Sequence, residues 1–233
     1  MYYIISLCIF LLIYVLAILF MHKIKKTILV DAVLIAVTFL CYVALVIIVY
    51  TEVGFDDWNF RNALPTANVS PFMFCTLIIY VFLPKKAKNV WSRLISLLSL
   101  GMIMAVVIGC ISRAVINYKF HFQFVLDYVS HIALSILGVY LVKSNQVDLK
   151  IKDCLISGSL IVATALCMLI INAFAGTAFF GLAFNDQYNI YNMVLVNNCY
   201  LSAFIYFVGL ILVLVAGYFY LRLITLKRKK SDI

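Results

Sequence analysis

Charged residues are scarce in this chain of 233 residues, since Asp, Glu, Lys and Arg together make up only 12% of it. Soluble domains carry about 25% charged residues, because most of their surface faces water. Apolar residues, in contrast, account for 67% of the chain. A chain that faces lipid can use so many apolar positions, whereas a water-soluble fold cannot. The composition therefore excludes a sizeable soluble domain and predicts one integral membrane domain over 1–233.

Acidic residues are scarcer still, with 9 Asp and Glu against 18 Lys and Arg, which gives a net charge of +9. The basic residues lie in short clusters between apolar runs and do not form one extended face. This pattern is typical of membrane topology signals and not of a surface that binds nucleic acid. We therefore predict membrane lipids as partners and no nucleic acid.

Motifs for metals and soluble cofactors are also missing. The seven cysteines form no CxxC pair, and the chain has no HExxH sequence and no glycine-rich nucleotide loop. His22 and His121 fall in connections on opposite sides of the expected membrane, so the three histidines cannot form one metal site. We expect no metal and no cofactor.

Apolar runs, by contrast, are long and frequent. A membrane span needs about 20 mainly apolar residues in a helix. Runs of this kind lie at 2–21, 27–50, 65–84, 94–116, 125–143, 154–178 and 199–222. The predicted fold class is therefore all-α: a polytopic membrane helical bundle with about seven transmembrane helices.

The connections between these runs differ sharply in charge. Most basic residues lie in or beside 22–26, 85–93, 144–153 and 223–233, whereas the alternate connections hold only Arg61 and Lys119. Short connections rich in Lys and Arg stay in the cytoplasm. We therefore expect a multi-pass protein of the cell membrane, with its N-terminus outside and 223–233 as a short basic cytoplasmic tail.

The third run begins with the polar sequence PTANVSP. A helix that started at Ser70 would have about 14 residues before Pro84, or about 21 Å, which is too short for a hydrocarbon core of about 30 Å. The chain is therefore expected to enter the membrane near Pro65, with Thr66 and Asn68 at membrane depth. Polar backbone there must face protein or a wet cavity. In the alternative interpretation, these groups only satisfy the backbone of a kinked or re-entrant helix.

The fifth run carries Asp127, His131 and Ser135, which are spaced by four and share one face of a helix. If the helix starts near Val125, His131 lies about 9 Å from its outer end. Ionisable groups at such depth usually face the bundle interior. Asp127 is expected to orient the His131 ring, although both residues can also serve only to join helices.

Two further polar residues lie near the outer ends of their runs. Arg113 can extend to the interface, form an ion pair with Asp127, or bind a phosphate or carboxylate head group. Asn172 lies at a similar depth in the sixth run. We expect one cavity that opens to the outer leaflet and is lined by Thr66, Asn68, Ser70, Arg113, Asp127, His131 and Asn172.

Two segments carry a family resemblance. LPTANVSPFMF and SRAVINYKFHFQFVLDYVSHIALSILGVYLV resemble the YwaF-like bacterial integral membrane proteins, a family related to a eukaryotic transmembrane phospholipid acyltransferase. The resemblance covers about 60–200 and rests best on Pro65 and on His131 at the histidine position. In the eukaryotic enzyme a Cys thought to carry the acyl group follows the proline, and here that position is Thr66. Distantly similar membrane hydrolases of fatty-acid esters instead imply Thr–His chemistry.

Three functional hypotheses follow. In the first, the protein is a lipid acyltransferase or acyl hydrolase with a hydroxyl nucleophile and a His base. Its catalytic residues are Thr66 or Ser70, His131 and Asp127, and its substrate-binding residues are Asn68, Arg113 and Asn172. In the second, the protein binds or transports a small solute, with Asp127 and His131 as a proton-coupled pair. In the third, it is a non-catalytic membrane partner whose polar groups only join helices.

Overall fold

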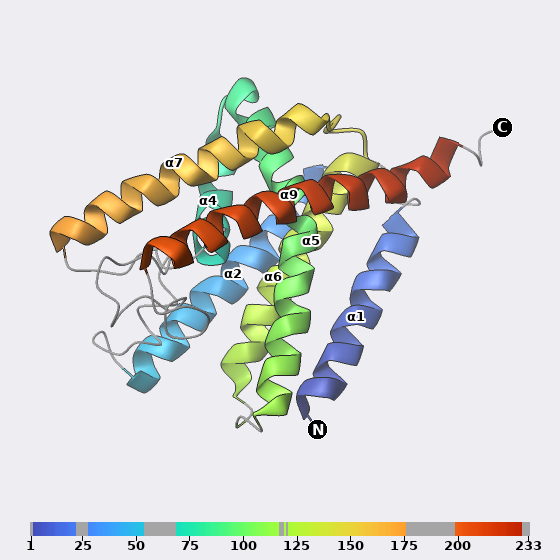
Figure 1. Cartoon of the computed structure of the whole chain (residues 1–233). Helices are drawn as coiled ribbons and strands as arrows, with labels where there is room; N and C mark the ends of the chain where they lie inside the picture. The colour runs from blue at the N-terminus through green and yellow to red at the C-terminus, as the bar shows by residue number, and fades with distance from the viewer. Residues whose placement is uncertain are drawn as a thin grey trace.

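The chain folds into long apolar helices. The computed structural model describes residues 2–21, 28–53, 69–116, 119, 121–175 and 199–229, and within these ranges all regular elements are helices (Figure 1). They are α1 (Tyr2–Phe20), α2 (Ile28–Val53), α4 (Val69–Phe82), α5 (Lys85–Val115), α6 (Phe122–Lys143), α7 (Ile151–Ala175) and α9 (Cys199–Lys229). Six are long and apolar enough to cross a membrane, and α4 is a shorter apolar helix. The prediction of an all-helical, multi-pass membrane protein is therefore confirmed.

Large apolar side chains cover much of the outer surface. Leu29, Phe174 and Phe204 are 70%, 89% and 64% exposed, and similar residues line the outer faces of the other helices. In water such a surface would be unfavourable, whereas in hydrocarbon it is not. Helices suit this environment because each one satisfies its backbone hydrogen bonds internally.

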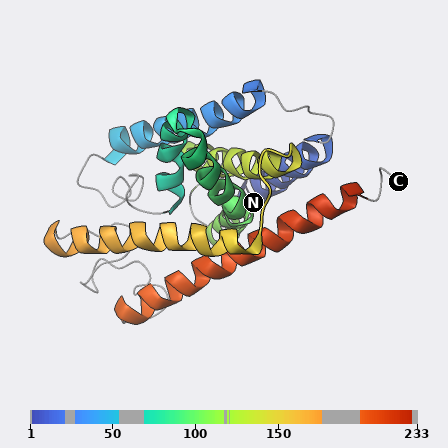
Figure 2. The same cartoon turned by 90° about the horizontal axis from the view of Figure 1, so that it is seen from above.

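Helices α5 and α6 form the centre of the bundle. They have the largest share of buried residues among the long helices and run antiparallel, with α1 and α2 beside them (Figure 1). Helices α7 and α9 cross this group as a separate layer on one side, as the view from above shows (Figure 2). Small residues let the two central helices approach closely: a Cβ at Gly138 would lie 2.7 Å from the Ile95 carbonyl oxygen and 2.9 Å from Ser99 Cβ.

Hydrogen bonds tie several helix ends together at one end of the bundle. Lys143 Nζ, at the end of α6, donates to the Ile18 carbonyl oxygen near the end of α1 over 2.9 Å. Gln146 Nε2, just after α6, donates to Asp31 Oδ1 in the first turn of α2 over 3.2 Å. The end of α1, the start of α2 and the end of α6 therefore lie together beside basic connections, and we call this end of the bundle the basic end.

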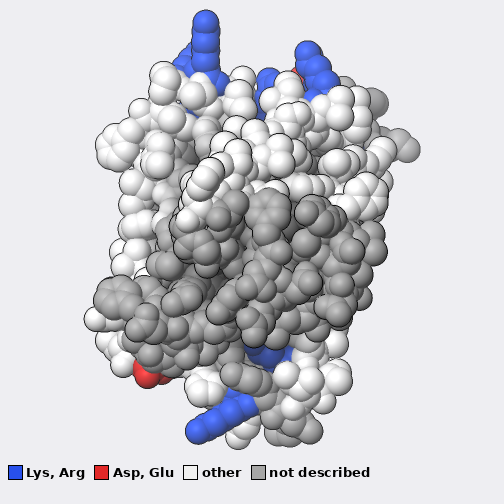
Figure 3. All heavy atoms as spheres, turned by 60° about the vertical axis from the view of Figure 1, so that its left-hand side comes forward, with Lys and Arg blue, Asp and Glu red and all other residues white. Residues whose placement is uncertain are grey.

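The opposite end is marked by another long-range hydrogen bond. Tyr3 OH, in the first turn of α1, donates to the Lys119 carbonyl oxygen between α5 and α6 over 3.0 Å. Lys and Arg side chains project from both ends of the face seen in Figure 3, and no charged side chain among those described is visible between them. The described side chains of this face are therefore charged only toward its two ends, a distribution that suits a membrane-spanning protein.

Several helix ends differ from the predicted spans. Helix α5 begins at Lys85, directly after the extended Pro84, so the expected connection 85–93 is helical. Helix α9 continues to Lys229, so most of the expected tail 223–233 is helical as well. Hydropathy marks where a helix lies in lipid and not where it ends, and Lys and Arg are good helix formers in water. The 14 residues of α4 correspond to about 21 Å, and the expected membrane entry near Pro65 lies outside the described residues.

Candidate functional site

The depth of His131 in the bundle is set by helix α6. The helix begins at Phe122, directly after the extended residue His121. This start is three residues before the predicted one. His131 is therefore roughly 14 Å from the start of the helix at 1.5 Å per residue, and not the predicted 9 Å. Its side chain is 9% exposed, so this imidazole is well inside the protein.

Asp127 holds the His131 ring in two ways. His131 Nδ1 lies 2.8 Å from the backbone carbonyl oxygen of Asp127 and 3.3 Å from its carboxylate Oδ1. A carbonyl oxygen only accepts, so Nδ1 must carry a proton in this arrangement. In the neutral ring Nε2 is then the acceptor. The expected orienting contact between these two residues is therefore present, and the Asp127 side chain keeps 29% exposure.

Helix α4 supplies the next neighbour of the ring. Phe74 packs edge-on against His131 with ring centroids 5.0 Å apart. The half-buried Ser70 lies one turn earlier on the same face of α4. No hydrogen bond joins Ser70 to His131 in the part of the chain that the structure describes. Thr66 and Asn68, the other expected cavity residues of this segment, lie outside the described ranges.

Arg113, near the end of α5, packs against aromatic residues of α6. Its Nη1 donates to Tyr128 OH over 2.6 Å and to the Gly109 carbonyl oxygen over 3.3 Å. The guanidinium carbon lies 4.1 Å from the centre of the Phe124 ring, a cation–π geometry. Among the described residues Asp127 forms its ion pair with His131 and none with Arg113. The ion pair between Arg113 and Asp127, one of the predicted alternatives, is therefore not formed among the described residues.

Ser135 belongs to a separate hydrogen-bonded cluster. Its Oγ lies 2.6 Å from the Ser99 carbonyl oxygen of α5 and 3.0 Å from Tyr14 OH of α1. Tyr14 OH in turn lies 2.6 Å from Tyr220 OH of α9. We call Tyr14, Ser99, Ser135 and Tyr220 the hydroxyl junction, because it joins four helices.

The predicted stripe on α6 is therefore divided between two sites. His131 faces α4 through Phe74, whereas Ser135 faces α1 and α5. Residues four apart differ by about 40° around a helix of 3.6 residues per turn, which is enough to change the neighbour. Tyr14 and Tyr220 were not predicted. In the sequence each is one of several tyrosines in its apolar run, and Tyr220 lies near the end of the run 199–222.

Asn172 occupies the last part of α7, and its side chain is not among those described. The C-terminal end of α7 lies at the edge of the molecule, away from α1, α5 and α6 in both views (Figures 1 and 2). The structure therefore brings Asp127 and His131 together, places Arg113 on the same helix pair, and keeps this end of α7 apart.

Within the described ranges no three His, Cys, Asp or Glu side chains come together as a metal site would need. The site consists instead of one imidazole–carboxylate pair, one guanidinium and hydroxyl groups. These groups can accept a proton, orient a ring and bind an anion.

No protein-family model, no curated protein and no solved structure matches this chain. The arrangement of these residues therefore carries the functional argument.

Proposed function

We propose that this protein is an acyltransferase or acyl hydrolase of the cell membrane that acts on an ester of a membrane lipid. The observation that carries the proposal is the His131–Asp127 pair. The carbonyl oxygen and the carboxylate Oδ1 of Asp127 both contact Nδ1 of the His131 ring. The opposite nitrogen, Nε2, is then the group that can take a proton from a hydroxyl. A His with a carboxylate beside it is the usual arrangement for activating a weak nucleophile.

The proposed reaction has two halves. The hydroxyl of Ser70 or Thr66 attacks the acyl carbonyl while His131 Nε2 takes its proton, and the imidazolium then protonates the departing alkoxide. Water or the hydroxyl of a second lipid attacks the resulting acyl ester of the protein, His131 again acts as base, and the nucleophile is regenerated. In both halves Asp127 stabilises the imidazolium, since a charge-assisted hydrogen bond is stronger than a neutral one.

Ser70 is the described candidate for the nucleophile. Helices α4 and α6 run in the same direction (Figure 1), and Phe74 of α4 contacts His131 of α6. One turn earlier on each helix, Ser70 is then at the level of Asp127. This alignment of α4 and α6 supports a position of the Ser70 hydroxyl near the His131–Asp127 pair. A substrate ester would then lie between α4 and α6.

The proposal extends to topology. We infer a seventh membrane crossing that includes α4, with the basic end of the bundle in the cytoplasm. The positive charge of that end supports this orientation. Single-cysteine variants in a cysteine-free background would test it: a membrane-impermeant thiol reagent added to intact cells should spare a cysteine at position 86 and label one at position 119. The reverse pattern would overturn the orientation.

The enzymatic proposal is tested with purified protein in liposomes that contain lipids with a labelled acyl chain. Release or exchange of the label should depend on the protein and fall at least a hundredfold in His131→Gln. Ser70→Ala should abolish turnover if Ser70 is the nucleophile. Ser112→Ala is the matched control, because Ser112 is exposed and its hydroxyl bonds only to the Gly109 carbonyl oxygen of its own helix. Unchanged turnover in His131→Gln would refute the mechanism.

A second candidate, the non-catalytic membrane partner, is favoured by the hydroxyl junction. Its hydrogen bonds join α1, α5, α6 and α9 without any exposed reactive group. If polar residues serve only this purpose, His131→Gln should lower stability to a degree similar to Ser135→Ala. The wild-type protein would then show no turnover of any labelled lipid.

A further inference from the structure

Helices α4 and α5 form a hairpin with a short basic tip. Helix α4 ends at Phe82 and α5 begins at Lys85, so only two residues separate them. Lys85 and Lys86 are exposed and Lys88 is half-buried, with its Nζ 4.9 Å from the centre of the Tyr80 ring. We call Phe82–Lys88 the hairpin tip.

The hairpin tip contains no acidic residue that would offset its lysines. The first turn of α5 contains no acidic residue, and its N-cap makes no side-chain hydrogen bond. Lysines at the positive end of a helix dipole are unfavourable, and neighbouring ammonium groups repel one another. An external anion would remove both costs.

Acidic residues at the same end of the bundle have partners outside the hairpin tip. Asp153 pairs with Arg93 over 2.7 Å, and Asp31 accepts from Gln146. The exposed Asp148 interacts with Arg222. Asp31 also acts electrostatically on Tyr80, whose ring contacts Lys88. One carboxylate does not neutralise three lysines, so the hairpin tip keeps a net positive charge.

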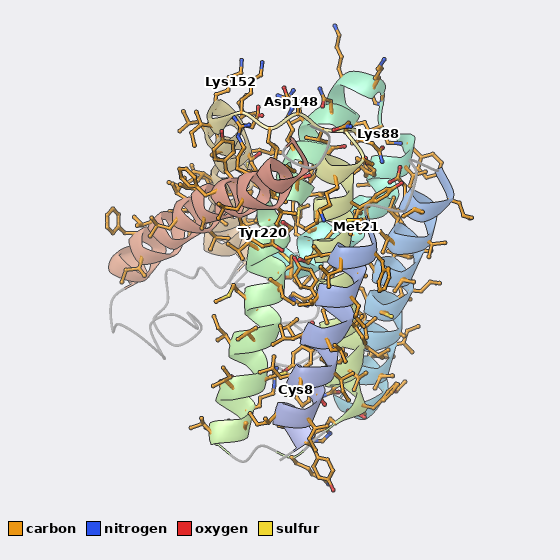
Figure 4. All side chains as sticks on the ribbon, turned by 90° about the vertical axis from the view of Figure 1, so that its right-hand side faces the viewer. Cys8, Met21, Lys88, Asp148, Lys152 and Tyr220 are labelled. Atoms are coloured by element: carbon orange, nitrogen blue, oxygen red, sulfur yellow. The ribbon has the colours of Figure 1, made fainter. Side chains whose placement is uncertain are left out.

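Basic residues from a second helix extend this surface. Lys150 and Lys152, at the start of α7, are exposed, and the Arg93–Asp153 ion pair holds this start against α5. Figure 4 shows Lys88 and Lys152 at the same end of the molecule, with Cys8 of α1 toward the other end. The positive surface is thus shared by α5 and α7.

An exposed aromatic ring lies beside the lysines. Phe82 is 82% exposed and directly precedes the two linking residues. An aromatic or aliphatic anchor next to Lys is typical of segments at the membrane–water boundary, where the ring enters the acyl region and the ammonium groups reach the head groups. A soluble acidic partner would not require this ring, so the combination favours lipid.

We propose that the hairpin tip, together with Lys150 and Lys152, binds anionic phospholipid head groups of the leaflet that it faces. The ligand class is a phosphodiester lipid with net negative charge, such as phosphatidylglycerol. Zwitterionic phosphatidylcholine should bind less tightly, because its choline group opposes the approach of the lysines. This lipid interaction does not depend on the acyl-transfer chemistry proposed above.

The experiment is native mass spectrometry of the full-length protein in detergent, titrated separately with phosphatidylglycerol and phosphatidylcholine. Wild-type protein should retain phosphatidylglycerol preferentially, and added salt should reduce this preference. Each lysine near an anionic surface contributes enough that its removal should weaken binding roughly fivefold. Lys85→Gln/Lys86→Gln and, independently, Lys150→Gln/Lys152→Gln should therefore weaken phosphatidylglycerol binding roughly 25-fold each.

The matched control is Lys119→Gln, which removes an exposed lysine from the opposite end of the bundle. This variant should bind phosphatidylglycerol as the wild type does. Equal weakening in the control would overturn the proposal, because it would mean that overall charge and not this surface attracts the lipid. Wild-type affinity in both double variants, or an equal loss of phosphatidylcholine, would also overturn it. Two separate exposed pairs are used so that a folding defect in one variant leaves the other decisive.

Discussion

His131 Nδ1 lies 2.8 Å from the backbone carbonyl oxygen of Asp127, so a peptide group and not only a carboxylate holds the imidazole ring. The carboxylate of the same residue, 3.3 Å away, adds negative charge next to that nitrogen. The two contacts have different tasks: the carbonyl fixes the tautomer, and the carboxylate stabilises the protonated ring. A substitution can separate these tasks.

Asp127→Asn removes the charge but keeps the carbonyl. We expect the neutral ring to keep its proton on Nδ1, and the free energy of unfolding to change by about 1 kcal/mol or less. Lipid turnover should fall about tenfold to a hundredfold, because a charge-assisted hydrogen bond to the imidazolium contributes roughly 1.5–3 kcal/mol. Side-chain ¹⁵N NMR of His131 gives the tautomer and the liposome assay gives the rate. A ring proton found on Nε2 would contradict the assignment.

Ser135→Ala tests the hydroxyl junction. The substitution removes the hydrogen bonds to the Ser99 carbonyl oxygen and to Tyr14, and we expect a loss of about 0.6–1.7 kcal/mol, the range found for hydrogen bonds between membrane helices. Reversible unfolding in mixed micelles measures this loss. Ser130→Ala is the control on the same helix, because Ser130 is equally buried and bonds only to the Leu126 carbonyl oxygen. If both variants lose the same stability, the junction has no special role.

Gly138→Ala should disrupt the contact between α5 and α6. The new methyl group would lie 2.7 Å from the Ile95 carbonyl oxygen, so the backbones must separate, at a cost of about 1–3 kcal/mol. Gly209→Ala is the matched control, since a Cβ there meets nothing within 4 Å. It should be neutral or slightly stabilising, because Ala favours a helix over Gly by up to about 1 kcal/mol. Thermal unfolding of the two variants compares them, and equal behaviour would contradict the close approach.

Asp153→Asn should weaken the attachment of α7 to α5. The Asp153 side chain is 1% exposed; it pairs with Arg93 and also accepts from the backbone N–H of Lys150 at the start of α7. Losing one partner of a buried ion pair lowers the free energy of unfolding by about 3–5 kcal/mol. Because the Arg93 side chain is 27% exposed, water can partly solvate its charge, and we expect a loss at or below the lower end of this range. Asp148→Asn, at an exposed position, should change stability by about 0.5 kcal/mol or less. Limited proteolysis near residue 150 should be faster in Asp153→Asn alone.

The sequence predicted where the helices lie much better than where they end. Hydropathy reports the part of a helix that lies in lipid, so it located the apolar helices to within a few residues. It could not detect the first turns of α5, which begin at Lys85, nor the extension of α9 to Lys229. Charged residues continue a helix in water without leaving a hydropathy signal, and this is why these two boundaries were missed.

The arrangement of the helices was beyond prediction from periodicity. A helix that is apolar on all sides, such as α1, has no stripe that indicates its neighbours. The contact between Asp127 and His131 was predictable because it is local, at positions four apart on one helix. The partners of Ser135 were not, because Tyr14 and Tyr220 lie on other helices and their hydroxyl groups resemble ordinary interfacial tyrosines in the sequence.

The Tyr14–Tyr220 hydrogen bond joins residues that are 206 positions apart, which has a consequence for biosynthesis. Helix α1 enters the membrane long before α9 is made, so Tyr14 must wait for its second partner until 206 further residues have been synthesised. Ser135, whose helix is made earlier than α9, can satisfy Tyr14 in the meantime. The hydroxyl junction therefore closes only when α9 arrives, and a chain that stops before Tyr220 leaves Tyr14 without one of its two hydrogen-bond partners.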